Sequence, residues 1–163
     1  WSEYTAAWLR EAVAREVPTL GVCYGHQLLA HALGGRAGPN PRGRQIGTVE
    51  AKLLEPATDD LLLKHLPSSF LAQTTHQEVV LEVPAGAARL ATSPLDDNFT
   101  IRFAERAWGV QFHPEFSAPV MSEYIQCRSS ALISEGLDPK QLQQGVRDTP
   151  EARSVLTVFK SLL

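Results

Sequence analysis

Hydrophobic residues recur along this chain at two spacings, which mark helices and strands in turn. Within residues 2–16, apolar side chains return at intervals of a helical turn, at Tyr4, Trp8 and Ala12, with Leu9 and Val13 on the same stripe. This spacing predicts an amphipathic helix whose apolar stripe packs on the core, with Ser2 as its N-cap. By the same criteria we expect further helices at 26–33, 58–67, 118–134 and 150–163, and strands at 19–22, 46–54, 70–75, 78–83, 89–92, 99–104 and 108–112.

The order of these elements indicates the fold class. A strand–turn–helix unit near the start is typical of an α/β protein, an open and mostly parallel sheet with helices on both faces. The run of strands from 46 to 112 has short connections, so we expect part of the sheet to be antiparallel. With 163 residues and no linker or repeat, residues 1–163 are expected to form one domain.

Composition and charge exclude several classes of protein. A hydrophobic content of 44% is typical of a globular domain and not of a disordered chain. The net charge is -3 and Lys and Arg form no stripe, so we expect no nucleic-acid partner. No apolar stretch approaches the roughly 18–20 residues of a membrane span, so no membrane association is expected. Cys23 and Cys127, far apart and without secretory features, are expected to be free thiols in the cytoplasm.

The strongest chemical signal lies between the first predicted strand and its helix. In Gly21-Val22-Cys23-Tyr24-Gly25 a thiol stands between two glycines, the pattern of a nucleophile elbow. The helix N-terminus favours the thiolate form of Cys23, and the Tyr24 N–H is expected to stabilise an oxyanion. The alternative is a buried cysteine that only fills a glycine-rich turn.

A nucleophilic cysteine needs a base, and the base needs an orienting group. His113 ends the last predicted strand, and Glu115 follows after Pro114, which fixes the backbone between them. The carboxylate could accept the imidazole N–H and set its tautomer. The alternative is that both side chains are solvated in a turn.

The two segments together resemble the signature blocks of the class I, triad-type glutamine amidotransferases. The matching stretches are Gly21-Val22-Cys23-Tyr24-Gly25-His26-Gln27 and Gly109-Val110-Gln111-Phe112-His113-Pro114-Glu115. The resemblance implies a flavodoxin-like fold that hydrolyses L-glutamine to glutamate and ammonia. It implies Cys23 as nucleophile, His113 as base and then acid, and Glu115 as its orienting group, with no metal or organic cofactor.

The resemblance also implies where substrate is held. It assigns a glutamine contact to Gln27, and a role in shaping the pocket to His76 and Gln77. The stretch 40–44 and the loop at 75–77 are most similar to the stand-alone, GMP-synthase-like branch of the family.

Other polar residues have simpler interpretations. A metal held by Cys23 with His26 and His31 is not expected, because five helical positions separate the two rings by about 140°. Arg42 and Arg44 could touch an acceptor phosphate, but a solvated loop explains them equally well. Cys127, within a predicted helix, is expected to serve packing only.

The chain also departs from the family pattern. Trp1 opens directly in a helical pattern, whereas family members carry roughly 60–80 residues before this helix, in keeping with ordinary domain sizes. In the family those residues hold the first strands of the sheet, which we expect this chain to lack, and a glycine-containing loop that supplies a second oxyanion amide. Without it we expect weak activity, lower by ~10²-fold or more. No phosphate-binding G-x-x-x-x-G-K loop is present, so use of the ammonia is expected to require a synthetase partner.

Two further functions fit the same residues. A γ-glutamyl amide or peptide hydrolase would use the same triad on a larger substrate. A binding or regulatory module would keep the fold without turnover.

Overall fold

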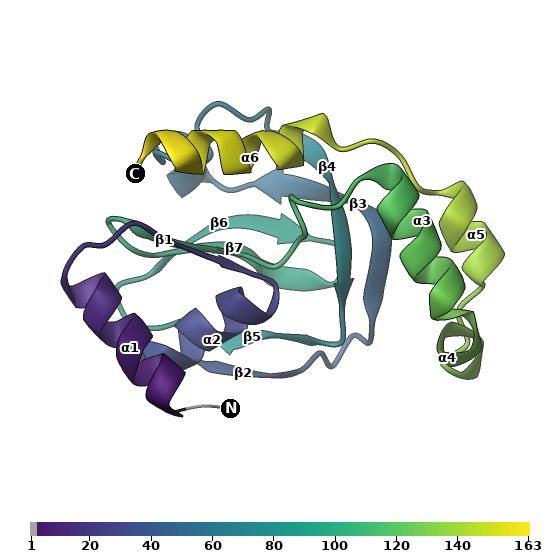
Figure 1. The fold of residues 1–163 in the computed structure, drawn as a ribbon, viewed down its shortest axis with the longest axis horizontal. Helices are drawn as coiled ribbons and strands as arrows, with labels where there is room; N and C mark the ends of the chain where they lie inside the picture. Colours follow the sequence, from purple (N-terminus) through teal and green to yellow (C-terminus); the bar gives the residue numbers. More distant parts are fainter. Residues whose placement is uncertain (1–2) are drawn as a thin grey trace.

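The structure is a computed structural model that describes residues 3–163, so the expected N-cap at Ser2 and the side chain of Trp1 lie outside the described residues. A helix–strand–helix unit opens the chain, a run of strands between residues 36 and 110 follows, and four helices close it (Figure 1). The helices are α1 (Glu3–Ala14), α2 (Tyr24–Ala32), α3 (Ala118–Cys127), α4 (Ser129–Ser134), α5 (Pro139–Gln144) and α6 (Pro150–Ser161), with a 3-10 turn η1 (Glu55–Ala57). The strands are β1 (Thr19–Val22), β2 (Arg36–Pro39), β3 (Gln45–Leu53), β4 (Ser69–His76), β5 (Glu78–Glu82), β6 (Ala88–Ser93), β7 (Asp96–Ala104) and β8 (Ala107–Val110).

Six strands form one curled sheet in the order β1-β8-β7-β6-β3-β4, and β2 pairs with β5 beside it. Strand β1 runs parallel to β8, while the other pairs in the described part of the chain are antiparallel. The expected α/β class with an antiparallel portion is confirmed. The antiparallel share is larger than expected within residues 3–163, because several successive strands are joined by turns too short for a parallel crossover.

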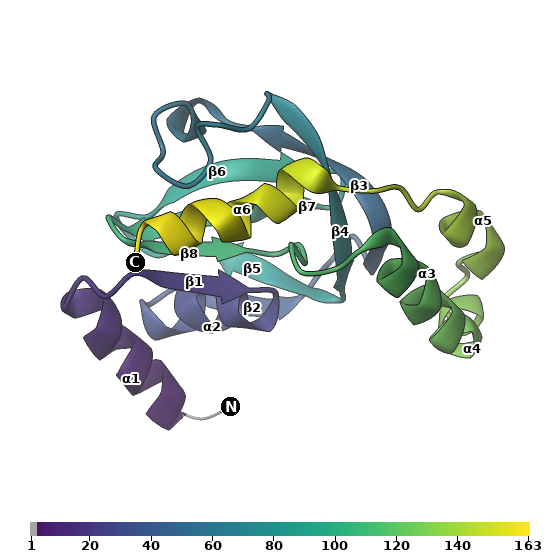
Figure 2. The same cartoon turned by 45° about the horizontal axis from the view of Figure 1, so that its top comes forward.

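Helices cover both faces of this sheet (Figures 1 and 2). On one face α6 packs Ala152 and Val155 against Trp108 and Phe112. On the other face α1 and α2 enclose a second cluster that includes Ile101. On β8, Trp108 and Val110 belong to the first cluster and Ala107 to the second, as the two-residue repeat of a strand dictates.

Helices α3, α4 and α5 form a separate group beside β3, around Ile46, Met121 and Leu132 (Figure 1). The single helix expected at 118–134 is interrupted at Arg128, whose ψ of 5° ends α3. The short helix expected at 58–67 is also wrong: η1 precedes it, and turns occupy residues 61–65.

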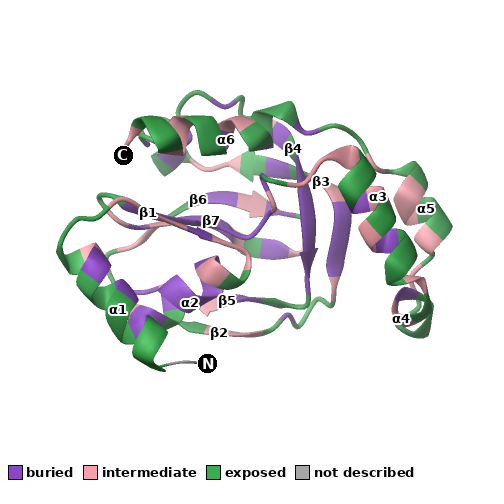
Figure 3. Ribbon diagram, viewed as in Figure 1, coloured by how far each residue is buried: buried purple, intermediate pink, exposed green. Residues whose placement is uncertain are grey.

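The apolar stripe expected on α1 is only partly correct. Tyr4 is 83% exposed and Trp8 is 61% exposed, whereas Ala6, Leu9 and Ala12 are buried (Figure 3). The helix therefore turns its small and aliphatic residues to the core, and its large aromatic rings stay at the surface. None of the helices among the described residues is long and apolar enough to cross a membrane.

Candidate active site

Cys23 forms the tight connection between β1 and α2. Its φ of 49° and ψ of -102° lie outside the conformations that most L-residues adopt, and its N–H donates to Val110 O over 2.8 Å. Gly21 makes the turn possible, since a Cβ there would lie 2.5 Å from the carbonyl carbon and oxygen of Gly25. Such local strain is typical of functional sites. The expected elbow geometry is present, with Tyr24 as the first residue of α2.

The parallel pairing of β1 with β8 brings the two sequence blocks together. Val22 lies opposite Val110 in this register, so Cys23 and Gln111 follow their strands side by side. Ligand sites in open α/β sheets lie at such carboxyl ends of strands. Residues 88 positions apart therefore meet, with the Gln111 amide 3.5 Å from the sulfur of Cys23.

His113 is anchored by its backbone and oriented by Glu115. Its N–H donates to Gln73 O over 2.8 Å, and its Nδ1 lies 2.6 Å from Glu115 Oε1. The ring also stacks on Phe116, with centroids 4.3 Å apart and an interplanar angle of 22°. With Nδ1 engaged by Glu115, Nε2 is the nitrogen left to interact with the thiol of Cys23, an interaction that raises the pKa of the ring.

The electrostatics of this group favour a protonated imidazole. Burial by itself lowers the pKa of His113, but the hydrogen bonds to Cys23 and Glu115 outweigh it and raise that pKa to about 9. Burial by itself would raise the pKa of Glu115, but the hydrogen bond to His113 outweighs it and leaves that pKa below its usual value. The pair therefore behaves as a carboxylate beside an imidazolium at neutral pH.

Gln27 is buried one helical turn after Cys23, and both hydrogens of its side-chain amide have acceptors. Its Nε2 donates to Glu78 O over 2.8 Å and to Gln111 Oε1 over 3.1 Å. Gln111 is fully buried and is a site residue to which the sequence motif alone assigned no role. The signal that could have found it is its position directly after β8, in register with the nucleophile.

The loop at His76 and Gln77 forms one wall beside this cluster. The ring nitrogens of His76 lie 3.0 Å from Glu78 O and 3.3 Å from Gln45 Oε1, and burial lowers its pKa to about 4. Gln77 donates to Glu135 Oε1 over 3.0 Å. Arg44 binds the same carboxylate through two hydrogen bonds, so this loop is tied to the end of α4.

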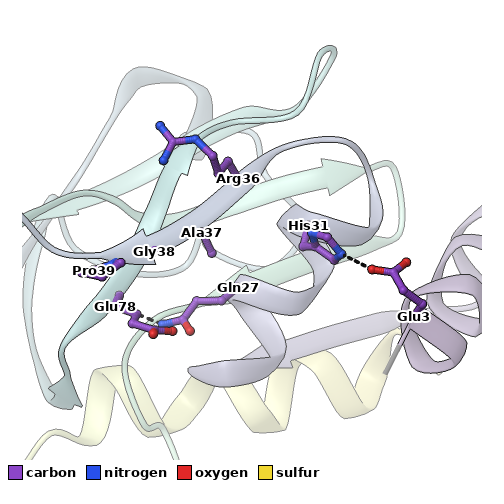
Figure 4. A pocket seen from close by; sticks show the side chains of 8 residues that line it. All are labelled: Glu3, Gln27, His31, Arg36, Ala37, Gly38, Pro39 and Glu78. Atoms are coloured by element: carbon purple, nitrogen blue, oxygen red, sulfur yellow. Dashed lines mark hydrogen bonds and ion pairs between the residues drawn. The ribbon is translucent and has the colours of Figure 1, made fainter. Parts of the chain in front are cut away.

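A pocket of about 390 Å³ opens on the other side of Gln27, between α1, α2 and β2 (Figure 4). Its polar lining includes Gln27, Glu78, Arg36 and a His31–Glu3 pair 2.9 Å apart. Gln27 connects it to the reactive sulfur, because the same side chain borders the pocket and contacts Gln111.

The remaining candidates lie apart from this cluster. Arg42 pairs with Asp97 over 3.2 Å, so both loop arginines have carboxylate partners within the chain. Cys127 is an exposed free thiol at the end of α3. Across residues 3–163, no group of three or more His, Cys, Asp and Glu side chains is arranged to hold a metal ion.

Comparison with known proteins identifies the family. The model of a family described as glutamine amidotransferase class-I matches residues 2–127. The chain is 41% identical over 98 residues to the GMP synthase [glutamine-hydrolyzing] of Aeropyrum pernix, covering 60% of this chain and 18% of that protein. It is 40% identical over 100 residues to the corresponding protein of Geobacillus kaustophilus, covering 61% of this chain and 19% of that one. The chain thus spans under a fifth of the length of these relatives.

Solved structures give the same result for the fold. A glutamine amidotransferase from Thermotoga maritima matches with a TM-score of 0.73 at 24% identity, over 98% of this chain and 65% of that one. A glutamine amido transferase from Methylobacillus flagellatus matches with a TM-score of 0.73 at 26% identity, again over 98% and 65%.

Proposed function

Because the chain belongs to the class I glutamine amidotransferases, we propose that it hydrolyses the side-chain amide of L-glutamine to glutamate and ammonia through a thioester on Cys23. The observation that carries this proposal is the contact of a strained cysteine with a His113–Glu115 pair 2.6 Å apart. The arrangement supplies a nucleophile, a base and an orienting carboxylate in one cluster.

The reaction proceeds in two halves. The proton of the Cys23–His113 pair already lies on Nε2 of His113 when glutamine binds, and the sulfur attacks the amide carbon of glutamine. The protonated ring then donates that proton to the nitrogen, the C–N bond breaks and ammonia leaves. A raised pKa of about 9 suits this step, because the ring keeps its proton at neutral pH until the leaving group takes it.

Hydrolysis of the thioester repeats these roles with water. The ring, neutral after ammonia has left, removes a proton from water, whose oxygen attacks the thioester carbon. The C–S bond breaks, glutamate leaves and Cys23 is restored. In both halves the Tyr24 N–H, at the positive end of the α2 dipole, stabilises the oxyanion.

Gln27, His76 and Gln77 are proposed to shape the glutamine site. Gln27 borders both the pocket and the catalytic cluster. His76 contributes through the loop it holds, since both of its ring nitrogens already face protein oxygens.

The ammonia is proposed to pass to a synthetase partner or domain. The relatives named above are GMP synthases, and this chain covers under a fifth of their length.

The test is covalent labelling followed by turnover. A chloromethyl ketone analogue of glutamine should modify Cys23 and leave the exposed Cys127 unmodified, and free glutamine should protect Cys23 from the label.

Turnover of the variants is the second measurement. Cys23→Ala should lower ammonia release by at least ~10³-fold, His113→Ala nearly as much and Glu115→Gln less, while Cys127→Ala retains most activity. Faster cleavage of larger γ-glutamyl amides than of glutamine would favour the γ-glutamyl hydrolase. Labelling of Cys127 instead of Cys23, or wild-type rates in His113→Ala, would overturn the proposal.

A further inference from the structure

Gln111 places an amide donor directly on the reactive sulfur. Its side chain is fully buried, and its backbone N–H is fixed to Phe99 O over 2.9 Å. The side-chain Nε2 donates to Cys23 Sγ over 3.5 Å. A thiol has little need of such a donor, whereas a thiolate gains from it because hydrogen bonds to charged acceptors are stronger.

The direction of this amide is determined by a chain of hydrogen bonds. A backbone carbonyl can only accept, so Gln27 must turn its NH₂ group toward Glu78 O. The same NH₂ group meets Gln111 at 3.1 Å, which obliges Gln111 to present its oxygen there. Its own NH₂ group then points at the sulfur. The chain of donors thus runs from Gln27 to Gln111 to Cys23.

We propose that Gln111 is a catalytic residue that donates a hydrogen bond to the Cys23 thiolate, and that Gln27 is a positioning residue that fixes the direction of this donor. The inference rests on the proposed function, in which Cys23 is the nucleophile. The sulfur is negative before it attacks the amide carbon and again when the C–S bond breaks. At both points Gln111 stabilises it without changing the net charge of the site.

Few other groups act on this sulfur. From the segment after β8, His113 and through it Glu115 face Cys23, and His76 affects the charge on His113 from β4. The carbonyl of Thr75, 3.9 Å from Sγ, accepts from the thiol and would repel a thiolate. Gln111 therefore offsets a neighbour that opposes ionisation.

The experiment measures alkylation of Cys23 by iodoacetamide against pH, in a Cys127→Ser background that removes the exposed thiol. In Gln111→Met the midpoint of this profile should move upward by about one pH unit, a tenfold loss of thiolate on the acid side. Gln111→Glu keeps the side-chain shape and sets a carboxylate near the sulfur, so its midpoint should move further. Gln27→Met should move the midpoint in the same direction by a smaller amount.

Two comparisons separate this role from loosened packing. Gln143→Met removes another side-chain amide that donates to a backbone carbonyl, Ser122 O at 3.1 Å, and should leave the midpoint unchanged. The double variant Gln27→Met/Gln111→Met should shift the midpoint no further than Gln111→Met alone, because both act through one donor. Circular dichroism checks that each variant is folded; if Gln111→Met does not fold, Gln111→Glu gives the reading.

An unchanged midpoint in the folded Gln111 variants, or an equal shift in Gln143→Met, would overturn the proposal. The assay does not depend on glutamine turnover. A protein that shifts as expected but hydrolyses no glutamine would refute the proposed function and leave the donor role standing.

Discussion

The two glycines on either side of Cys23 contribute differently to the turn that holds it. The motif suggests that both glycines are needed for lack of a side chain. In the structure Gly21 is pressed against the backbone of Gly25, while a Cβ on Gly25 would meet nothing within 4 Å. Only Gly21 is required by space, and Gly25 lies in α2, where glycine is a poor helix former.

We therefore expect opposite effects from two matched substitutions. Gly21→Ala must push the start of α2 away from β1, so it should lower the melting temperature and slow the alkylation of Cys23. Gly25→Ala should keep or raise the melting temperature, by up to ~1 kcal/mol of helix stability. Thermal unfolding followed by circular dichroism measures both. Equal losses in the two variants would show that the close approach at Gly21 does not shape the elbow.

Residue type and spacing were enough to predict the convergence of Cys23, His113 and Glu115, because each carries recognisable chemistry at the end of an apolar strand. Residue type and spacing could not predict that the side chain of Gln111 contacts the sulfur of Cys23. A glutamine has no reactivity of its own, and its contact with sulfur depends on the register of β1 against β8. The direction of its amide depends further on Gln27 and on a carbonyl from another strand.

Helix α1 shows the same limit at the level of an element. Periodicity correctly predicted a helix. Within the expected apolar stripe, however, Ala12 is buried, while Tyr4 and Trp8 are exposed. The buried face of α1 is the one that packs on α2. Ala6 and Leu9 lie in this contact, and the aromatic rings of α1 do not. Hydrophobicity alone does not determine which of two overlapping apolar faces is buried.

This assignment can be tested by comparing one exposed and one buried position of α1. Trp8→Gln should change the free energy of unfolding by no more than about 0.5 kcal/mol, because its side chain is largely in solvent. Leu9→Ala should cost about 2–5 kcal/mol, as buried leucines do. Chemical denaturation of both variants gives the values. A larger loss for Trp8→Gln than for Leu9→Ala would restore the aromatic stripe as the packing face.

Short elements were the hardest to predict. Strand β2 spans four residues, and it exists through its pairing with β5, a partner that lies about 40 positions away. Helix α5 did carry a local signal, since Asp138 caps the amides of Lys140 and Gln141 and Pro139 begins the helix. The interruption at Arg128 has no comparable signal, because Ile125 and Leu132 on either side of it pack into the same cluster.

For the molecule as a whole, the buried carboxyl of Asp96 should govern one part of the dependence of stability on pH. Burial raises its pKa from 3.8 to about 6, and its Oδ2 has no hydrogen-bond partner within residues 3–163. The folded chain thus binds a proton that the unfolded chain has released. The free energy of unfolding should fall as the pH rises from about 4 to about 6, and stay lowered above that window.

Asp96→Asn should therefore stabilise the protein in a pH-dependent way. We expect a gain of up to about 3 kcal/mol near pH 7.5, where the wild-type carboxyl is ionised, and little gain near pH 4. Asp97→Asn is the matched control, since its exposed carboxylate pairs with Arg42 and should give no such gain. Urea denaturation at the two pH values measures this. The same gain at both would mean that ionisation of Asp96 is not the cause.

The parallel pairing of β1 with β8 has a mechanical consequence. Cys23 and Gln111 follow two adjacent strands, so the separation of the sulfur from the Gln111 amide follows the spacing of hydrogen-bonded backbones, close to 4.8 Å. Loosening of α5 or α6 should leave this spacing intact, whereas α3 reaches His113 through Tyr124 and Phe116. The reactivity of the Cys23 thiol therefore reports whether β1 and β8 remain paired. On heating, it should persist while α5 and α6 loosen, and it should be lost when these two strands separate.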